Sequence, residues 1–193
     1  MLERLKDIDT RLFLFLNGQH NSFFDPIMYW ISDKYFWTPF YLLIVILIIR
    51  AYKKKSILIL FCIGILITLS DQLSSHLIKP WVKRLRPSHN PAIENLVHLS
   101  KAGGGGLYGF VSGHATNSFA LFIFLCLVLS TKFDWLKKVL FFWAILICYS
   151  RIYVGVHYPG DVICGAILGS LVAWLVALLY NWISNSQWFK KAR

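Results

Sequence analysis

Residues 36–78 read FWTPFYLLIVILIIRAYKKKSILILFCIGILITLSDQLSSHLI, which is two apolar runs joined by a short basic loop. A hydrocarbon core about 30 Å thick is crossed by roughly 20 mostly apolar helical residues. The first run, residues 36–50, begins with aromatic side chains, as is typical of a membrane interface. The second, residues 56–78, stays apolar as far as Leu69. We therefore expect two membrane-spanning helices here.

Three further apolar runs bring the expected number of spans to five, at residues 115–130, 139–149 and 162–183. Residues 1–35 differ, because their apolar stretches are short and are interrupted by Gly18 and Pro26. An interfacial or partly embedded amphipathic segment fits them better. The predicted fold class is all-α, an integral membrane helical bundle of about five to six transmembrane helices in a single domain, residues 1–193.

The composition supports a membrane protein. Of the 193 residues, 57% are hydrophobic and 15% are charged, against about 45–50% and 25% in an average soluble domain. The 20 Lys and Arg outnumber the 9 Asp and Glu, which gives a net charge of +11. So apolar a chain is not disordered, and it lacks the water-soluble exterior of a nucleic-acid binder. The four cysteines lie in apolar runs without a C-x-x-C pair and are expected to pack rather than bind metal: Cys62, Cys126, Cys148 and Cys164.

The charges give a weak indication of orientation. With five spans, the 20 cations divide equally between the two sides. A compact cluster between Arg50 and Lys55 lies in a short loop, where positive charge most strongly marks the cytoplasmic side. We therefore expect this loop and the C-terminus, with Lys190, Lys191 and Arg193, to be cytoplasmic. Residues 79–114 are then an extracytoplasmic active-site loop.

Three polar segments fall on that extracytoplasmic side, and charged groups at membrane depth are functional candidates. They contribute three cations, Lys79, Arg86 and Arg151, of which the two guanidinium groups match the geometry of phosphate oxygens. Ser112 and Gly113 stand at the expected start of a helix, where free backbone N–H groups favour an anion. The sequence thus predicts a phosphate-binding site.

The same segments carry groups suited to phosphoryl transfer. A neutral His157 can attack phosphorus, and Asp161 can fix its tautomer and stabilise the charged ring that forms. His114 is then available as the acid that protonates the leaving oxygen. Such a set predicts a phosphohistidine intermediate. No carboxylate cluster remains to hold Mg²⁺, so we expect no cofactor.

Three motifs, K-x6-R-P (79–87), S-G-H (112–114) and S-R-x5-H-x3-D (150–161), resemble the signatures of the type 2 phosphatidic acid phosphatase family. Its superfamily also contains the vanadium haloperoxidases. The resemblance implies His157 as nucleophile, Asp161 as its partner and His114 as acid, without a metal ion. It also implies six helices in many relatives, and a proline where this chain has Val111. The phosphate-binding residues that it implies are Lys79, Arg86, Ser112, Gly113 and Arg151.

Several residues have other interpretations. Lys83 and Arg84 are expected only to contact solvent or lipid headgroups, and Asp161 could cap the last helix. We expect Asp71 to meet a polar partner across the bundle, and glycines 103–106 to make the loop mobile. The histidines outside the motifs are expected to be structural or loop residues, with His76 nearest to the site: His20, His76, His89 and His98.

We therefore predict a phosphatase of the bacterial inner membrane whose site opens on the extracytoplasmic face. Its substrate is an envelope lipid: undecaprenyl diphosphate, a lipid A phosphate or phosphatidylglycerol phosphate, with the small size of the chain slightly favouring the first. The expected partners are the lipid substrate and the bilayer, without nucleic acid, and the oligomeric state is open. The alternatives are a non-catalytic membrane scaffold that binds anionic lipids and, less compatible with the spans, a vanadate-dependent haloperoxidase.

Overall fold

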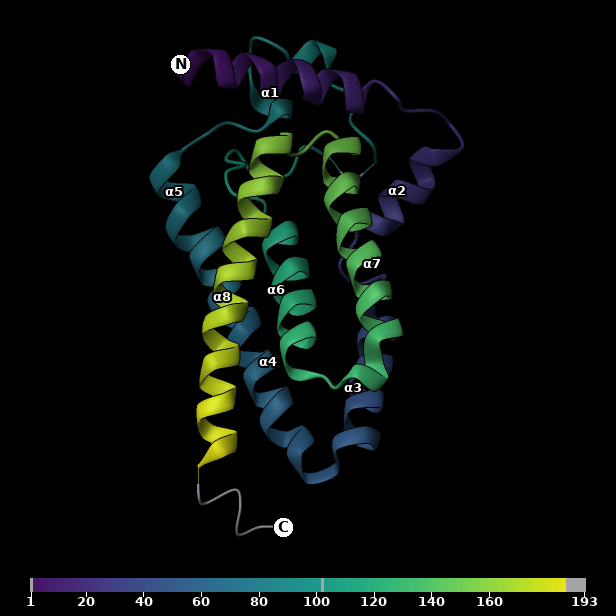
Figure 1. Ribbon diagram of the computed structural model, residues 1–193. Coiled ribbons are helices and arrows are strands. Elements are labelled where there is room, and N and C mark those ends of the chain that lie inside the picture. The colour runs from purple at the N-terminus through teal and green to yellow at the C-terminus, as the bar shows by residue number, and fades with distance from the viewer. Residues whose placement is uncertain (1, 102, 187–193) are drawn as a thin grey trace.

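A computed structural model describes residues 2–101 and 103–186, so Lys190, Lys191 and Arg193 lie outside the described residues. All regular structure in the described part is helical, apart from one isolated bridge between Leu85 and Tyr108 (Figure 1). The all-α class is therefore confirmed. Five long helices build the bundle: α3 (Thr38–Tyr52), α4 (Ser56–Asp71), α6 (Gly113–Val128), α7 (Asp134–Tyr153) and α8 (Pro159–Asn185).

Shorter helices connect and extend the bundle. A π-helical segment, η2 (Gln72–Ile78), continues α4 into α5 (Lys79–Val82). Two helices precede the bundle, α1 (Leu2–Asn17) and α2 (Phe24–Ser32). Single 3-10 turns complete the described elements: η1 (Lys53–Lys55), η3 (Pro87–His89), η4 (Glu94–Leu96) and η5 (Thr131–Phe133).

Two helical stretches of the described chain are long and apolar enough to cross a membrane. Thr38–Val82, which turns back at η1, has a mean hydropathy of 2.1, and Pro159–Asn185 has one of 2.6. α6 is apolar but has only 16 residues. The number of spans therefore stays a prediction.

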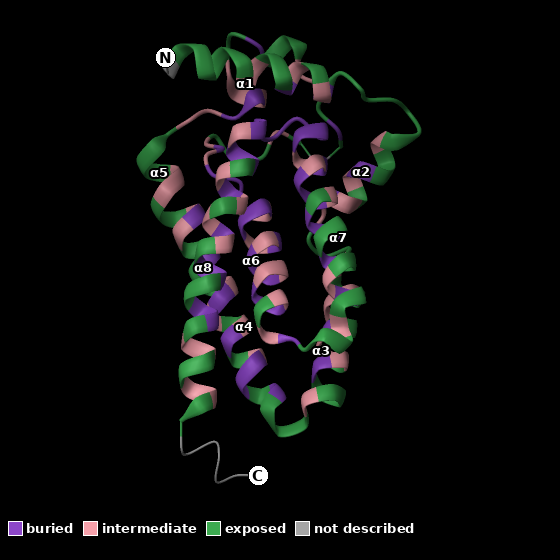
Figure 2. Cartoon of the chain, in the orientation of Figure 1, coloured by how far each residue is buried: buried purple, intermediate pink, exposed green. Residues whose placement is uncertain are grey.

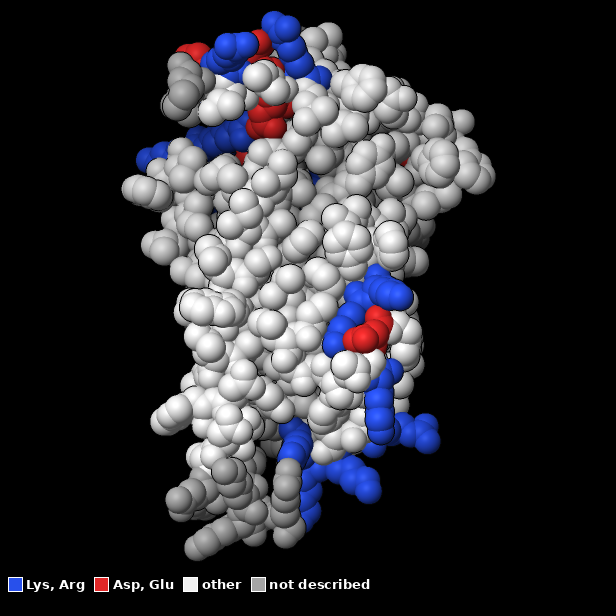
Figure 3. Space-filling model, viewed as in Figure 1, with Lys and Arg blue, Asp and Glu red and all other residues white. Residues whose placement is uncertain are grey.

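The surface of the bundle is that of a lipid-facing protein. In Figure 3, one group of charged side chains lies at the upper end and a second covers the lower right part, from about the middle downward, while the remaining surface in this view is uncharged. Large apolar side chains are exposed on the bundle helices, among them Phe61 (60%), Phe142 (68%) and Leu175 (58%). The exposed positions lie on the outward faces of the helices in Figure 2. Exposed apolar area of this extent marks contact with a membrane or another protein.

Two glycines of α8 let it approach α6 closely. A Cβ atom placed on Gly169 would lie 2.1 Å from the carbonyl oxygen of Thr116, and one on Gly165 would lie 2.7 Å from that of Ser112. Small residues four apart allow such backbone contact between membrane helices. The contact continues to the ends of the helices, where the N–H of Ser112 donates to the carbonyl of Asp161 at 3.0 Å. The S-G-H and H-x3-D motifs are thereby held side by side.

The N-terminal helix α1 lies across the end of the bundle that carries the α7–α8 connection, whereas the turn η1 lies at the opposite end (Figure 1). Its buried Asn17 donates from Nδ2 to the carbonyls of Tyr153 (2.8 Å) and His98 (3.0 Å). The Oδ1 atom of Asn17 accepts the N–H of His98 at 2.8 Å. Residues 2–35 thus form two docked helices separated by a loop, and their position at a membrane interface stays a prediction.

Candidate active site

A cavity of about 510 Å³ opens among α3, α4, α6 and α7. It is lined by six of the eight predicted site residues: Lys79, Arg86, Gly113, His114, Arg151 and His157. The other two, Ser112 and Asp161, are fully buried behind its wall. Three sequence segments separated by up to 82 positions, from Lys79 to Asp161, therefore meet at one end of the bundle.

Arg86 is fixed by the loop that leads to the S-G-H motif. Its Nε donates to the carbonyl of Tyr108 at 3.2 Å, and its N–H donates to that of Leu107 at 3.1 Å. Nη1 is buried and has no hydrogen-bond partner among the described residues. Burial lowers the pKa of Arg86, and the nearby carboxylate of Asp161 partly opposes this. A charged donor without a partner is suited to an incoming anion.

Gly105 makes room for that guanidinium group. Its φ of +67° lies in the region that favours glycine. A Cβ atom at this position would lie 2.5 Å from Nη1 of Arg86. The glycine run thus has a steric function beside the site, in addition to the mobility expected from the sequence.

The other two cations approach from different helices. Nη1 of Arg151 donates to both the carbonyl (3.2 Å) and the hydroxyl of Ser32, at the end of α2, while Nε has no partner among the described residues. Nζ of Lys79 lies 3.6 Å from the position of a Cβ atom on Gly113, beside the start of α6. A Cβ atom at this position would be in ordinary van der Waals contact with the lysine.

Ser112 differs in detail from the sequence expectation. Its N–H, expected to be free for an anion, is bonded to the carbonyl of Asp161. Its hydroxyl oxygen, in contrast, is buried without a hydrogen-bond partner in the described structure. Ser112 therefore offers a side-chain donor, and the free N–H groups of α6 begin after it.

His157 and Asp161 form the buried centre of the site. Nδ1 of His157 lies 3.5 Å from Oδ2 of Asp161, slightly beyond a normal hydrogen bond. The same Oδ2 accepts the N–H of Tyr158 at 3.1 Å, so one carboxylate both faces the imidazole and caps the first turn of α8. Burial, followed by the charges of Arg86, Arg151 and Lys79, lowers the pKa of His157 well below 6.5. The imidazole is therefore neutral at neutral pH.

Gly109, which no motif singled out, lies beside these groups. A Cβ atom here would lie 3.0 Å from Oδ2 of Asp161, 3.2 Å from Cγ of Arg86 and 3.5 Å from Nδ1 of His157. A side chain here would crowd the carboxylate of Asp161 and the side chain of Arg86, beside the imidazole. Nothing in the sequence distinguishes this glycine from the preceding four.

Arg84 was expected to contact only solvent or headgroups, and this prediction is wrong. Its Nη1 donates to Oδ1 of Asp161 at 2.8 Å, and its Nη2 donates to Oδ2 of Asp9 in α1 at 2.6 Å. Burial alone would lower the pKa of Arg84, but the two carboxylates raise it above its usual value. The R-x-R-P spacing could have suggested that both arginines point inward, but Asp9 has no comparable sequence signal.

Asp71 and His76 also differ from their expected environments. Oδ1 of Asp71 accepts from the hydroxyl of Ser75 at 3.3 Å, one turn further along the same helical stretch, rather than from a partner across the bundle. Asp71 lines the cavity, whereas His76 is exposed and does not line it.

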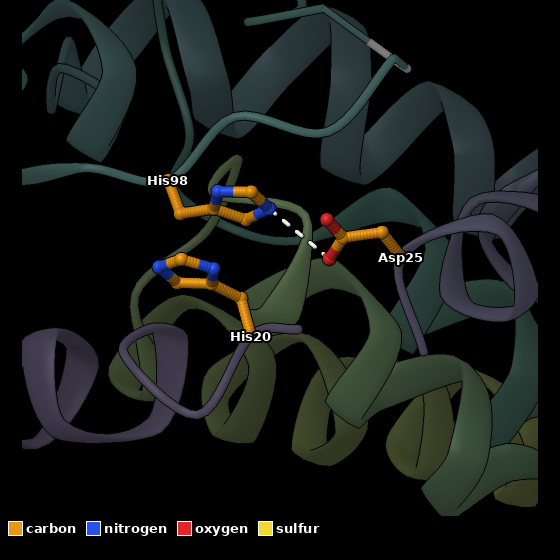
Figure 4. Close-up of side chains that lie close together, drawn as sticks. All are labelled: His20, Asp25 and His98. Carbon is orange, nitrogen blue, oxygen red and sulfur yellow. Dashed lines mark hydrogen bonds and ion pairs between the residues drawn. The ribbon is translucent and has the colours of Figure 1, made fainter. Parts of the chain in front are cut away.

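Outside the cavity, His20, Asp25 and His98 bring potential metal-ligand atoms within 4.8 Å of one another (Figure 4). The rings of His20 and His98 are stacked with centroids 3.7 Å apart and planes within 5°. Nε2 of His98 lies 3.1 Å from Oδ1 of Asp25, which also accepts the hydroxyl of Tyr153 at 2.8 Å. Parallel rings do not direct their nitrogen lone pairs at one point, so this arrangement does not fit a shared cation. The stacked rings and the contact between His98 and Asp25 instead join the start of α2 and the loop before it to the loop before α6.

Fold and cavity together describe a helical bundle with a cavity lined by cationic side chains at one end. The chain belongs to the PAP2 superfamily, which it matches over residues 57–185. The resemblance drawn from the three motifs is thus confirmed.

Two relatives match most of the chain. The lipid A 4'-phosphatase of Bacteroides thetaiotaomicron is 40% identical over 178 residues, which is 91% of this chain and 78% of that protein. The lipid A 4'-phosphatase of Porphyromonas gingivalis is 36% identical over 193 residues, 97% and 78% of the two chains. These relatives are phosphatases, and this chain is an enzyme of the same class. The alternative of a non-catalytic scaffold thereby loses its support.

A solved structure shares the fold. The transmembrane PAP2-type phosphatidylglycerolphosphate phosphatase of Bacillus subtilis superposes with a TM-score of 0.66 at 24% identity, covering 95% of this chain and 90% of that chain. The likeness extends over the N-terminal helices as well as the matched bundle. The fold is that of a membrane phosphatase.

Proposed function

We propose that the protein removes a phosphate group from a lipid A phosphate through a phosphohistidine on His157. The observation that carries the chemistry is the neutral, buried imidazole of His157, backed by Asp161 and facing a cavity with three cations. A neutral imidazole is a nucleophile, and the cations compensate the charge that develops on the phosphoryl oxygens.

The reaction follows from the positions of these groups. Lys79, Arg86 and Arg151 bind the phosphate oxygens, and Nε2 of His157 attacks phosphorus. The P–O bond to the lipid breaks, and His114 donates a proton to the leaving oxygen. Water then attacks the phosphohistidine, gives its proton to His114 and releases inorganic phosphate, which restores the free imidazole. Asp161 stabilises the positive charge on His157 during both steps.

The remainder of the cavity favours a lipid as the phosphate donor. Beyond the cations its wall is mainly apolar, although Asn117 and Ser118 also line it. The apolar side chains come from α3, α4, α6 and α7: Ile44, Val45, Ile63, Ile67, Leu121, Trp143 and Ile147. A polar end joined to an apolar wall suits a molecule with a phosphorylated headgroup and hydrocarbon chains.

The choice among lipids rests on the relatives. Both lipid A 4'-phosphatases align with more than nine-tenths of this chain. This outweighs the small size of the chain, which had favoured undecaprenyl diphosphate. We infer an extracytoplasmic site in the bacterial inner membrane, because the α7–α8 connection and the start of α8, which carry His157 and Asp161, lie at the end of the bundle opposite the basic turn η1 (Figure 1).

The test compares phosphate release by the purified protein from lipid A, undecaprenyl diphosphate and phosphatidylglycerol phosphate in mixed micelles with a chelator. We expect lipid A to have the highest kcat/KM. His157→Ala should abolish release, whereas the control His76→Ala, at an exposed position outside the cavity, should not affect it. Turnover that persists in His157→Ala would refute the nucleophile, and a preference for another lipid would refute the substrate.

A further inference from the structure

We propose that Arg84 and Asp9 are positioning residues that hold Asp161 against His157, and that helix α1 thereby contributes to the geometry of the active site. This inference rests on the proposed roles of His157 and Asp161. Neither Arg84 nor Asp9 lines the cavity, so both act through another residue.

Arg84 bonds one oxygen of the Asp161 carboxylate, and the other oxygen faces His157. Oδ1 accepts from Nη1 of Arg84 at 2.8 Å, whereas Oδ2 faces the Nδ1 atom of His157 and the N–H of Tyr158. The carboxylate is fully buried, and rotation about its last bond would exchange the two oxygens. The ion pair with Arg84 opposes that rotation and keeps Oδ2 directed at the imidazole.

Asp9 fixes Arg84 in turn. Its Oδ2 accepts from Nη2 of Arg84 at 2.6 Å, and its Oδ1 accepts the N–H of Gly160 at 2.7 Å. One carboxylate of α1 thus contacts both the arginine and the first turn of α8. Gly160 must lack a side chain here, because a Cβ atom would lie 2.7 Å from Oδ2 of Asp9.

The rest of this network partly shields the guanidinium group from water and leaves the Arg84 side chain 25% exposed. Cζ of Arg84 lies 4.1 Å from the ring centroid of Tyr158, in a cation–π contact. That ring also packs in a T-shaped contact against Phe13 of α1, with centroids 5.4 Å apart. The ion pairs are therefore partly desolvated, where removing one partner costs more than at a free surface.

The docked face of α1 is continuous. Asp9, Phe13 and Asn17 are spaced four residues apart, so they share one face, and each contacts the α7–α8 connection or the loop packed on it. An adjacent apolar stripe of α1 stays exposed and faces away from the bundle: Leu5, Ile8, Leu12 and Phe15. One face of α1 is thus an exposed apolar surface, and another carries the Asp9 carboxylate, which acts through Arg84 to position Asp161 against His157.

The experiment compares Asp9→Asn, Arg84→Lys and Arg84→Ala with two controls, Asp7→Asn and Lys83→Ala. Asp9→Asn keeps the acceptor for Gly160 but removes the charge facing Arg84, and Arg84→Lys retains a cation that reaches only one carboxylate. Asp7 and Lys83 are exposed neighbours in sequence. The first measurement is kcat and KM on lipid A in mixed micelles.

We expect kcat to fall about 100-fold in Arg84→Ala and about tenfold in Asp9→Asn and Arg84→Lys, because misplacement of a reacting group by about 1 Å can cost this much. KM should stay within about threefold of wild type, since the phosphate-binding cations are unchanged, and Arg84→Lys should recover part of the loss. The controls should match wild type.

A second measurement is independent of the lipid and of whether Arg84→Ala folds. Orthovanadate must bond to an aimed imidazole, whereas inorganic phosphate needs only the cations. In Asp9→Asn and Arg84→Lys, the Kd for vanadate should rise about tenfold, and the Kd for phosphate should change by less than about twofold, which also shows that the site is folded.

The outcomes separate the two proposals. A wild-type protein that binds vanadate but hydrolyses no lipid phosphate would refute the proposed function, while a selective loss of vanadate affinity in the variants would still support the positioning role. Wild-type kcat and wild-type vanadate affinity in Asp9→Asn and Arg84→Lys would overturn the inference. An equal loss of vanadate and phosphate affinity would also overturn it, because it would indicate a merely structural role.

Discussion

Replacing Gly169 with alanine places a methyl group at the closest contact between α6 and α8. The new Cβ atom would lie 2.1 Å from the carbonyl oxygen of Thr116 and 3.0 Å from the backbone nitrogen of Ala120. Ordinary contacts begin at 3.4 Å, so the first distance falls short by about 1.3 Å. Both neighbours are backbone atoms of a helix, which cannot rotate away as a side chain can.

The two helices must therefore separate, and the separation reaches the site. Overpacking of this kind costs about 1–3 kcal/mol of stability. The bond between the Ser112 N–H and the Asp161 carbonyl joins the same two helices, so their motion also displaces His114, on α6, from His157, beside α8. A displacement of about 1 Å between reacting groups can reduce the rate about 100-fold.

The assay is thermal unfolding in detergent together with kcat for phosphate release. Gly64→Ala is the matched control, because this helical glycine has nothing within 4 Å of the new Cβ atom, and it should gain up to about 1 kcal/mol from helix propensity. Gly169→Ala should lower both Tm and kcat. If it behaves like Gly64→Ala, the close packing of α6 on α8 does not set the site geometry.

Two other predictions concern the site itself. Because the pKa of His157 lies well below 6.5 and the neutral ring is the nucleophile, while His114, whose pKa is also lowered by burial and the nearby cations, must carry a proton to act as the acid, kcat/KM for phosphate release should rise as the pH falls from 8 to about 6.5 and decline only below that pH, as His157 becomes protonated. A loss of half the activity on going from pH 8 to 6.5 would contradict the neutral, buried imidazole. Gly105→Ala should raise KM about tenfold by displacing Arg86, a loss typical of one charge-assisted hydrogen bond. Gly103→Ala has the same positive φ (+69°) but no neighbour within 4 Å, so equal effects in the two variants would point to backbone strain instead.

Much of the bundle was predictable because hydrophobic runs report local structure directly. The run at 36–50 corresponds to α3, and the run at 162–183 lies within α8. The run at 139–149 was too short, because α7 begins at Asp134 and includes Lys137 and Lys138, whose charges ended the apolar pattern. A helix can extend beyond its apolar stretch wherever polar side chains reach water.

The N-terminal helices were less predictable. Their apolar stretches are too short to span, so the sequence indicated only an amphipathic segment, whereas the contacts that dock α1 join residues far apart. Asp9 and Arg84 are separated by 75 positions, and Asn17 and Tyr153 by 136. Periodicity contains no information about such pairs.

The candidate site was likewise predictable from the sequence only in part. The three motifs identified six of the residues that line the cavity, because their residue types match phosphate chemistry. They did not identify Gly109, whose importance lies in the lack of a side chain beside His157 and Asp161, or Arg84, whose partners come from α1 and α8. Residues that orient other residues are recognised only once the packing is known.

The central claim is a covalent phosphoryl group on His157. Its most direct test is rapid quenching of the enzyme with a lipid A preparation labelled in its phosphate, followed by proteolysis and location of the labelled peptide. The account predicts an alkali-stable, acid-labile label on His157 that forms and decays within one turnover and is absent from His157→Ala. A label on another residue, or single-turnover hydrolysis without any labelled protein, would contradict it.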